Sequence, residues 1–268
     1  MSAFGITYET AITFTLILIR VSGLMVYTPF FGSKTFPVQL KAGFTLIIAL
    51  LLFGTPETAL PAGSAFPVTV WGMLFAGLKE LSVGILIGLA ANMIFEAMQL
   101  AGQIVGQQMG FALVNVIDPL GDEQVSLIGL MKIQLALAVF VIIGGPGMLL
   151  GAIAQSYEFV PALGMQFSGH VTEAFMDMFA KMLVLAVKLA APSMVVLFMV
   201  SAVLGFLART VPQMNVFIIG FPLKIGVGLG VLAMAVPFLA TYMAMTAIPE
   251  MYRDVAEVVR LLGGTAAG

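Results

Sequence analysis

Residues 133–157 read IQLALAVFVIIGGPGMLLGAIAQSY and contain no charged side chain. A helix needs about 20 consecutive apolar residues to cross the hydrocarbon core of a bilayer, and this run is long enough. Residues 189–208 and 225–249 are two further runs without a charge. The three runs predict an all-α protein of the integral-membrane type.

Three other apolar segments carry a charge or are too short for a span. They are residues 10–33 with Arg20 inside, residues 42–56, and residues 68–95 with Lys79 and Glu80 inside. We therefore expect about six long, kinked hydrophobic helices arranged as helical hairpins. No soluble linker or second soluble domain separates these segments.

The composition excludes an ordinary soluble globular protein. Of the 268 residues, 61% are hydrophobic and only 9% are charged, against about 25% charged residues in soluble domains. The mean hydropathy is +1.12, and a single core cannot hide so much apolar surface, so this surface must face lipid or other subunits. Eleven Lys and Arg against thirteen Asp and Glu give no basic field for nucleic acid.

The residue types that most enzyme and metal sites need are scarce. The sequence has no cysteine and a single histidine, His170, which excludes thiolate catalysis and cysteine-based metal sites. It contains no phosphate-binding loop and no dinucleotide fingerprint. We therefore expect no enzymatic activity, no metal and no cofactor.

Glycine and proline interrupt the apolar runs. They cluster at residues 144–147 and recur as Pro192, Pro222 and Pro237. Because each proline removes a backbone donor, we expect kinked or interrupted helices there. Broken backbone at membrane depth is tolerated only where protein or a water-filled cavity covers it, which favours a conduit or a packed assembly. The expected loops are residues 29–37, 56–67, 118–121 and 210–213.

A polar stripe and a glycine stripe lie side by side on the helix expected from residue 90 onward. The polar positions are Glu96, Gln99, Gln103 and Gln107, and the glycines are Gly102, Gly106 and Gly110. Consecutive small-xxx-small repeats let another backbone approach closely, and amides in a dry interface can bond across it. The stripes predict either contact with a partner subunit or helix packing within this chain.

The apolar run FALVNVI at residues 111–117 follows the glycines and ends at Asp118 and Pro119. It is too short to span a membrane. Displayed beside a polar stripe, such a loop could occlude a passage, or it could be an ordinary buried connection.

Several charges stand alone in apolar sequence. The cations are Arg20, Lys132, Lys188 and Lys224, and the acids at comparable positions are Glu80, next to Lys79, and Glu96. A charge at the bilayer centre costs at least roughly 2.5 to 3.5 kcal/mol on insertion scales. We therefore expect partner acids, a water-filled lumen, or segments that lie outside the hydrocarbon layer.

The end of the chain changes character. Residues 249–262 place apolar side chains on one helical face and charged side chains on the other, so an amphipathic helix is expected. Residues 263–268 are expected to form an unstructured tail.

Specific motifs recur along most of the chain. Near the N-terminus these are Arg20, Gly23, the sequence PFFG at residues 29–32, Pro37 and Lys41. Lys79-Glu80-Leu81 follows, with Gly84, Gly88, Gly102, Gly106, Gly110, Asp118 and Pro119. The most distinctive is RTVPQMNVF at residues 209–217, followed by Gly220, Pro222 and Lys224. In these motifs, their order and the total length, the sequence resembles the FliR family, the R-type subunit of the flagellar export gate and of related type III secretion systems.

The resemblance implies a subunit that joins P-type and Q-type subunits in a closed helical ring through which unfolded secretion substrates pass. It also implies the B-type switch subunit and the A-type export subunit as partners, contact with membrane lipid, and a location at the flagellar basal body in the bacterial inner membrane. Nucleic acid is not among the expected partners.

The resemblance also implies a division of the chain and a set of site residues. Residues 1–170 would be the P-type-like part, with a central plug loop at about 106–119, and residues 171–248 the Q-type-like hairpin. The expected plug residues are Gly106, Met109, Gly110, Phe111, Ala112, Leu113, Val114, Asp118 and Pro119. The expected interface or lumen residues are Arg20, Lys79, Glu80, Glu96, Gln99, Gln103, Gln107, Lys132, Lys188 and Lys224. The family motif comprises Pro212, Gln213, Asn215, Phe217, Gly220 and Pro222.

One alternative from another functional class stays open at this stage. Glycine- and proline-broken segments around residues 144–147 and Pro222 could frame a midplane site for a small solute, with Lys79 and Glu80 in coupling, as in a secondary transporter. Such a bundle would be stable alone, whereas an export-gate subunit should copurify with smaller hydrophobic partners.

Overall fold

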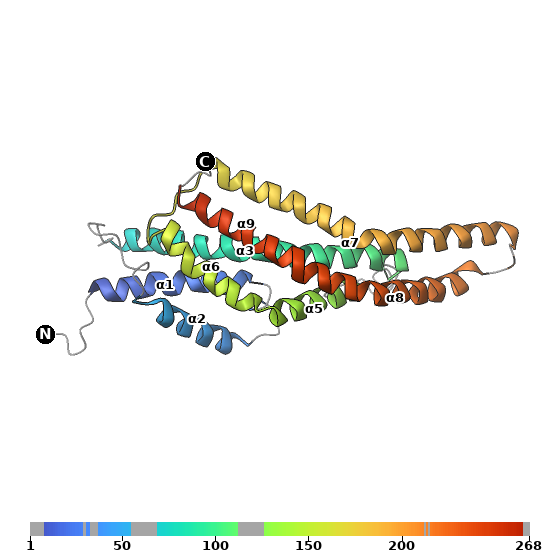
Figure 1. Ribbon diagram of the computed structural model, residues 1–268, viewed down its shortest axis with the longest axis horizontal. Helices are drawn as coiled ribbons and strands as arrows, with labels where there is room; N and C mark the ends of the chain where they lie inside the picture. The colour runs from blue at the N-terminus through green and yellow to red at the C-terminus, as the bar shows by residue number, and fades with distance from the viewer. Residues whose placement is uncertain are drawn as a thin grey trace. The chain divides into compact units, whose positions relative to one another are not determined.

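The computed structural model describes residues 8–28, 31–32, 37–54, 69–111, 126–211, 213 and 215–264. Over these ranges the chain is all-α, as expected (Figure 1). The helices are α1 (Tyr8–Tyr27), α2 (Val38–Leu52), α3 (Val70–Met109), α5 (Leu127–Ile142), α6 (Gly145–Phe159), α7 (Gly169–Thr210), α8 (Val216–Tyr242) and α9 (Ile248–Leu262). A π-helical turn, Met243–Ala247, joins α8 to α9.

The helices confirm a protein of the membrane type. Within the described ranges, four helical stretches are long and apolar enough to span a bilayer: α1, α3, α7 and the continuous stretch Ile218–Leu262. Taken together, α5 and α6 make a fifth candidate. α2 is shorter than a span. The number of long segments is therefore close to the six expected, but their boundaries differ.

Of the places where we expected kinked or interrupted helices, an interruption is present at residues 143–144. α5 ends at Ile142 and α6 begins at Gly145, because Gly144 adopts a left-handed conformation with φ 78° that favours glycine. α7 continues through Pro192, and α8 continues through Pro222 and Pro237. A proline removes a single backbone donor, and the remaining bonds keep these long helices uninterrupted.

The chain divides into two compact units, to both of which α3 and α7 contribute. The first unit comprises Met1–Met93, Gly144–Phe179 and Ile248–Gly268, and the second comprises Ile94–Ile143 and Ala180–Ala247. Each unit therefore assembles segments that are distant in the sequence.

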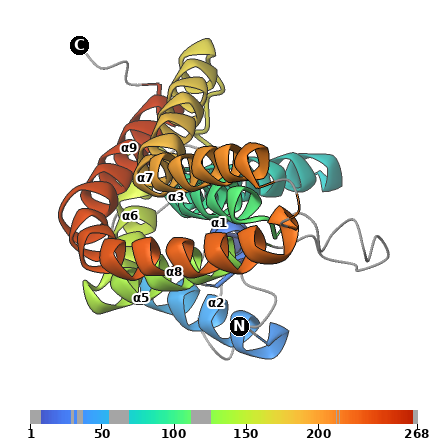
Figure 2. The same cartoon turned by 90° about the vertical axis from the view of Figure 1, so that its right-hand side faces the viewer.

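In the first unit, α1 packs against α2, and α6 lies beside α9 (Figure 2). α1 also approaches the first part of α3 closely, since a Cβ atom on Gly23 would lie 2.6 Å from the carbonyl oxygen of Leu81. A Cβ atom on Gly84 would collide with the carbonyl oxygen of Arg20. Glycines at this crossing bring the backbones of α1 and α3 together, which positions Arg20 next to α3.

α9 is the amphipathic helix expected at residues 249–262. One of its faces is buried in the first unit, and this face consists of Ile248, Met251, Val255, Val258, Val259 and Leu262. At the edge of this face, the Tyr252 hydroxyl donates a hydrogen bond of 3.3 Å to Oε1 of Gln155 in α6. The apolar face predicted from the sequence is therefore the face of α9 that is buried inside the first unit.

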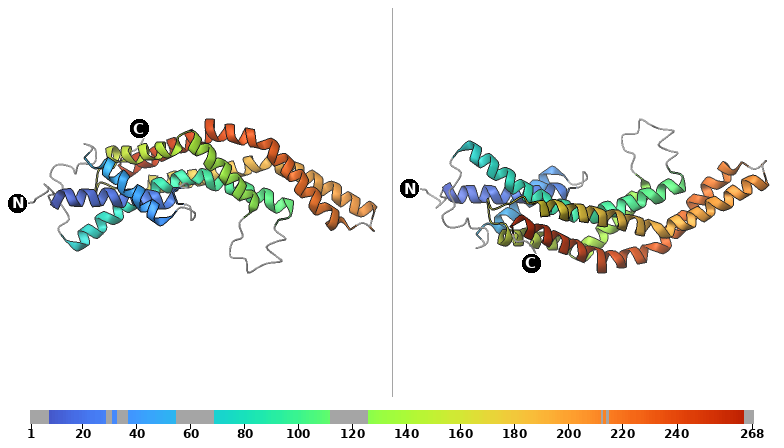
Figure 3. Two further views of the ribbon diagram at one scale, coloured as in Figure 1. Left: turned by 90° about the horizontal axis from the view of Figure 1, so that it is seen from below. Right: turned by 90° about the horizontal axis from the view of Figure 1, so that it is seen from above.

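In the second unit, the last part of α3 packs against α5. A Cβ atom on Gly102 would collide with Cα of Gly129, and the rings of Phe95 and Phe140 meet edge to face with centroids 5.4 Å apart. α8 runs back alongside the second part of α7 as a hairpin (Figure 3), and Gly220 of α8 lies against the side chain of Leu204.

Candidate functional site

The glycine stripe of α3 faces α5 of the same chain at two positions. Gly102 and Gly106 are both buried, and a Cβ atom on Gly106 would lie 2.6 Å from Oγ of Ser126. Ser126 caps α5, because its Oγ accepts a hydrogen bond of 3.2 Å from the backbone N–H of Gly129. We predicted either contact with a partner subunit or helix packing within this chain. Gly102 and Gly106 take part in packing within the chain.

The polar stripe beside it remains accessible. Glu96 and Gln107 are exposed, and Gln99 and Gln103 are half-buried. Sequence reasoning missed Gln108, whose Oε1 is buried without a hydrogen-bond partner in the described part of the chain. Gln99 lies against Gly129 of α5, so the stripe borders the α5 contact at this position and is exposed at Glu96 and Gln107.

The end of α3 has a well-defined geometry. Gly110 has φ 96°, a left-handed conformation that favours glycine at the residue after a helix. Its N–H donates to the carbonyl oxygen of Gln107, and the N–H of Phe111 donates to that of Gly106, both at 3.1 Å. These two bonds form a Schellman motif, which satisfies carbonyls that the helix end would leave unpaired.

This helix end contacts α8. Met109 is fully buried and lies against Gly228, and Gly110 lies against the ring of Phe221. Five of the expected plug residues lie outside the described residues: Ala112, Leu113, Val114, Asp118 and Pro119. The plug loop was expected at about 106–119, but α3 continues through Met109, so Gly106 and Met109 are helical and a loop can begin only at Gly110.

Arg20 and Glu80 occupy a place that differs from the expected interface or lumen. Both are buried inside the first unit, with side chains 0% and 1% exposed, and Nε of Arg20 donates to Oε2 of Glu80 at 2.6 Å. The two residues find each other because the glycines of α1 and α3 allow their backbones to meet. Their charges are neutralised within the chain, which corrects the expectation for this pair.

The rest of the Arg20 cluster comes from α6 and the residues after it. The guanidinium donates to Oγ of Ser156 and to the carbonyl oxygen of Val160, both at 3.0 Å, and its centre lies 3.9 Å above the ring of Tyr157. The second carboxylate oxygen of Glu80 accepts from the N–H of Leu163 at 3.0 Å. A stacked guanidinium with an acid and two further acceptors is well satisfied. Sequence reasoning did not identify Ser156, Tyr157 or Val160.

The surroundings of the four expected lysines differ from those of Arg20. Lys132 is 3% exposed, and its Nζ donates to the carbonyl oxygen of Leu189 at 3.3 Å. Lys79 and Lys188 are exposed and Lys224 is half-buried. Among the described residues, no carboxylate pairs with any of these four lysines.

The residues of the family motif lie at the start of α8. The Asn215 side chain accepts a hydrogen bond of 3.4 Å from the N–H of Ile218, and Gln213 is exposed. Gly220 is buried, and Pro222 is exposed within α8. Pro212 and the side chain of Phe217 lie outside the described residues. The motif therefore initiates α8 and supplies its contact with Leu204.

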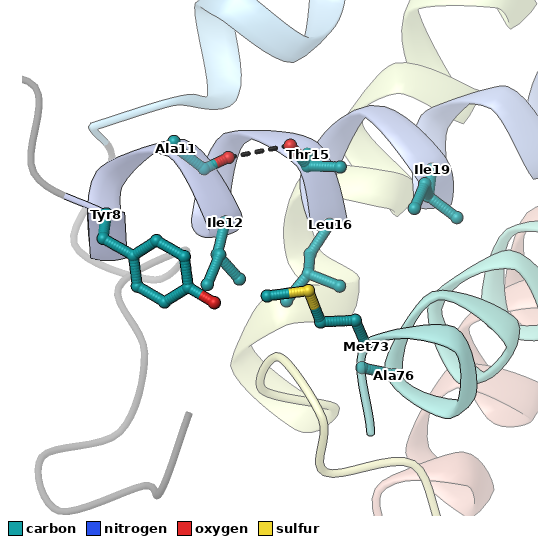
Figure 4. A pocket seen from close by; sticks show the side chains of 8 residues that line it. All are labelled: Tyr8, Ala11, Ile12, Thr15, Leu16, Ile19, Met73 and Ala76. Atoms are coloured by element: carbon teal, nitrogen blue, oxygen red, sulfur yellow. Dashed lines mark hydrogen bonds between the residues drawn. The ribbon is translucent and has the colours of Figure 1, made fainter. Parts of the chain in front are cut away.

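An apolar pocket of about 190 Å³ lies between α1 and the start of α3 (Figure 4). Its lining consists of Tyr8, Ala11, Ile12, Thr15, Leu16, Ile19, Met73 and Ala76. The Thr15 hydroxyl donates to the carbonyl oxygen of Ala11 at 2.8 Å, and the lining brings no carboxylate, lysine or imidazole together. Across the described ranges, no cluster of three or more His, Asp or Glu side chains could hold a metal ion.

A family of proteins matches almost the whole chain. The sequence model of this family, described as "Bacterial export proteins, family 1", matches residues 11–247. The chain belongs to this family. This membership confirms the FliR family that the motifs indicate, and with it a role as a membrane-embedded component of a bacterial export apparatus.

Named members of the FliR family and a related protein align with most of the chain. The flagellar biosynthetic protein FliR of Bacillus subtilis (strain 168) is 34% identical over 246 residues, which cover 90% of this chain and 89% of that protein. FliR of Escherichia coli (strain K12) is 26% identical, with 84% of each chain covered. The Yop proteins translocation protein T of Yersinia pestis is 30% identical, covering 80% of this chain and 81% of that protein.

Proposed function

We propose that this chain is the R-type subunit of a flagellar type III export gate in the bacterial inner membrane. With P-type and Q-type subunits it completes a closed helical ring, and unfolded secretion substrates pass through the pore of that ring. The A-type and B-type subunits of the same apparatus are its further partners. The chain acts as a gate and performs no chemical reaction.

In this proposal the segment that follows α3 closes the pore at rest. Met109, Gly110 and Phe111 begin this segment, and Ala112, Leu113, Val114, Asp118 and Pro119 continue it. The observation that carries the proposal is the Schellman motif at Gly110, which ends α3 directly before the apolar sequence FALVNVI at residues 111–117. Apolar side chains in a narrow passage block ions by dewetting.

The proposal includes a division of the chain. We assign residues 1–170 to a P-type-like part and residues 171–248 to a Q-type-like hairpin, followed by the amphipathic helix at residues 249–262. The hairpin of α7 and α8 exposes many large apolar side chains, among them Phe198, Met199 and Phe206. Such a surface must be covered by lipid or by neighbouring subunits, as a ring subunit requires.

The lysines of the second unit support an interface with acidic partners. Lys188 is exposed on α7 between Val184 and Val195, which are 52% and 59% exposed. An ammonium group inside an apolar face is costly unless an acid meets it. Carboxylates of the P-type or Q-type subunits would meet Lys188 and Lys224, while the polar stripe of Glu96, Gln99, Gln103 and Gln107 contacts partners or lines the lumen.

The proposal is tested by deleting residues 110–114 and measuring the ion conductance of the assembled complex and the export of substrate. We expect the conductance to rise while export is at least partly retained, because the deletion removes the apolar closure and leaves the helices in place. Deletion of residues 264–268, a segment of equal length at the other end of the chain, is the matched control and should leave both unchanged. An assembled complex whose conductance is unaltered by the first deletion would contradict the proposal.

A further inference from the structure

The apolar pocket of the first unit lies in a wedge between α1 and the first part of α3. A Cβ atom on Gly77 would lie 3.3 Å from Cδ1 of Ile19, and further along both helices one on Gly88 would lie 3.0 Å from Cβ of Tyr27. The two helices therefore run in the same direction and touch at these positions. Toward their N-terminal ends they separate (Figure 3), and the pocket occupies the space between them.

The pocket is apolar and opens to the outside. Figure 4 shows Ile12 and Leu16 on the side of α1 that faces Met73, which reaches them from α3. Tyr8 and Thr15 are exposed and supply the hydroxyl groups of the lining, and that of Thr15 already donates to a carbonyl oxygen of its own helix. An apolar cavity of about 150 Å³ stays dry and binds benzene. This pocket of about 190 Å³ is therefore suited to an apolar ligand.

The pocket is also elongated. Six of its eight lining residues belong to α1 and lie between Tyr8 and Ile19. At a helical rise of about 1.5 Å per residue, these eleven steps extend about 16 Å along the helix. Only Met73 and Ala76 line it from α3. A groove that is long and follows one helix accommodates a linear hydrocarbon chain better than a compact ring.

The surface around the pocket is one that faces lipid in a membrane-embedded protein. α1 is one of the helices long and apolar enough to span a bilayer. At the start of α3, next to the pocket, Val70, Trp71 and Phe75 are exposed. Tyrosine and tryptophan favour the level of the lipid headgroups, and Tyr8 and Trp71 lie in the first turns of α1 and α3. The pocket is thus continuous with this apolar surface, and its wide end carries residues typical of the headgroup level.

We propose that the pocket binds one acyl chain of a membrane phospholipid. The methyl end of the chain points toward Ile19, where the helices meet, and the headgroup lies near Tyr8 and Trp71. The bound chain fills the wedge and supports the N-terminal parts of α1 and α3. This proposal concerns the first unit alone and does not rest on the proposed closure of the pore.

The fluorescence of Trp71 tests the proposal, because it is the only tryptophan of the chain and precedes Met73 by two residues. The full chain is purified in digitonin, whose rigid steroid supplies no linear hydrocarbon chain. It is then titrated with a phosphatidylcholine that carries a dibrominated stearoyl chain, since bromine quenches indole fluorescence at short range. We expect quenching that saturates at a single lipid per protein chain. Quenching that rises without saturation would show that lipid only surrounds the protein, and would overturn the proposal.

Filling the pocket provides the matched comparison. Ala11→Phe adds a ring to an exposed residue of the lining, and Ala180→Phe adds the same ring to an exposed residue of α7 outside it. Ala76→Leu fills the pocket from α3. Each buried methylene group strengthens binding about fourfold, and we expect each filling variant to displace about two of them and to bind the lipid on the order of tenfold more weakly than the control. If both filling variants bound it like the control, the pocket would not be the site.

Thermal unfolding in digitonin gives a second readout. A ligand that binds only the folded state raises the unfolding temperature, so added phosphatidylcholine should raise Tm of the wild type and of Ala180→Phe. It should raise Tm of Ala11→Phe and Ala76→Leu much less. An equal rise in all four proteins would contradict a site in the pocket.

The assembled complex distinguishes a lipid from an apolar side chain of a neighbouring subunit. By native mass spectrometry of the complex extracted in digitonin, we expect the wild type to retain one phospholipid more than the Ala11→Phe complex, and both complexes to assemble in equal yield. If Ala11→Phe prevented assembly while Ala180→Phe did not, or if both complexes carried the same number of lipids, a subunit would fill the pocket and the proposal would be wrong.

Discussion

The two units of the molecule each bury a cation, and they stabilise it in different ways. Arg20 in the first unit has a carboxylate, a hydroxyl, a carbonyl and an aromatic ring around its guanidinium. Lys132 in the second unit donates to one carbonyl oxygen, that of Leu189, and pairs with no carboxylate among the described residues. The buried cation of the first unit is therefore neutralised by an acid of the same unit, and among the described residues the buried cation of the second unit is not.

This difference indicates which part of the chain depends on other subunits. A buried ion pair with further hydrogen bonds can form only where its helices are already held together, as α1, α3 and α6 are in the first unit. A buried ammonium with one neutral acceptor retains unsatisfied donors. The second unit also contains Lys188 and Lys224, so we expect partner acids to meet this unit.

The largest effect is expected from Arg20→Met. The substitution leaves the buried Glu80 carboxylate without its cation, and breaking a buried pair in this way costs about 3–5 kcal/mol of folding free energy. Thermal unfolding of the detergent-solubilised protein measures the loss, and Lys79→Met, at the exposed position next to Glu80, is the control. A loss no greater than that of the control would show that the pair does not hold the first unit together.

Methyl groups at the helix crossings should have a smaller effect. Gly84→Ala in the first unit and Gly102→Ala in the second unit each press a Cβ atom against the backbone of the facing helix, and overpacking costs about 1–3 kcal/mol. Gly43→Ala and Gly151→Ala meet no atom within 4 Å and serve as controls in the same unfolding measurement. If the first pair unfolded like the controls, the close approach of these helices would be disproved.

Lys132→Met should change stability less than Arg20→Met does. It removes one hydrogen bond to a charged donor, but it also removes the cost of burying an ammonium group without an acid, and the two effects oppose each other. We expect a net change within about 1 kcal/mol in the isolated chain, from the same unfolding curves. A destabilisation as large as that of Arg20→Met would remove the contrast between the units.

Lys188→Glu should leave the isolated chain almost unchanged, within about 0.5 kcal/mol, because the side chain is exposed. The yield of the assembled complex should fall, since the new carboxylate would face a partner acid. The control is Glu158→Lys, a charge reversal at an exposed position of the first unit. Equal yields of the two variant complexes would exclude an acidic partner at Lys188.

Part of the fold could be predicted because local patterns determine it. Long apolar runs without charges require membrane-type helices, and the left-handed Gly144 ends α5 within one of those runs. The lengths of α3 and α7 were underestimated, because the apolar runs were measured between charged residues, whereas α3 continues past Glu96 and α7 begins before Lys188. Close contacts with α5 hold Gly102 and Gly106 in helical conformations that intrinsic preference disfavours.

The candidate site was less predictable. Arg20 and Glu80 were identified as unusual, but their mutual contact was not, because 60 positions separate them and Ser156 is 136 positions from Arg20. A single sequence carries no information about such pairings. The contact of Met109 with Gly228 was missed for the same reason. The glycine-rich sequence of α8 was nevertheless a signal that a neighbouring group approaches closely.

The mass of the complex extracted from the membrane in mild detergent tests the central claim most directly. The account predicts that this chain is found together with smaller hydrophobic subunits, in a particle with a defined number of copies of each. If extraction from the native membrane yields this chain without any companion protein, and that chain binds a small solute, the account is contradicted and a secondary transporter is favoured.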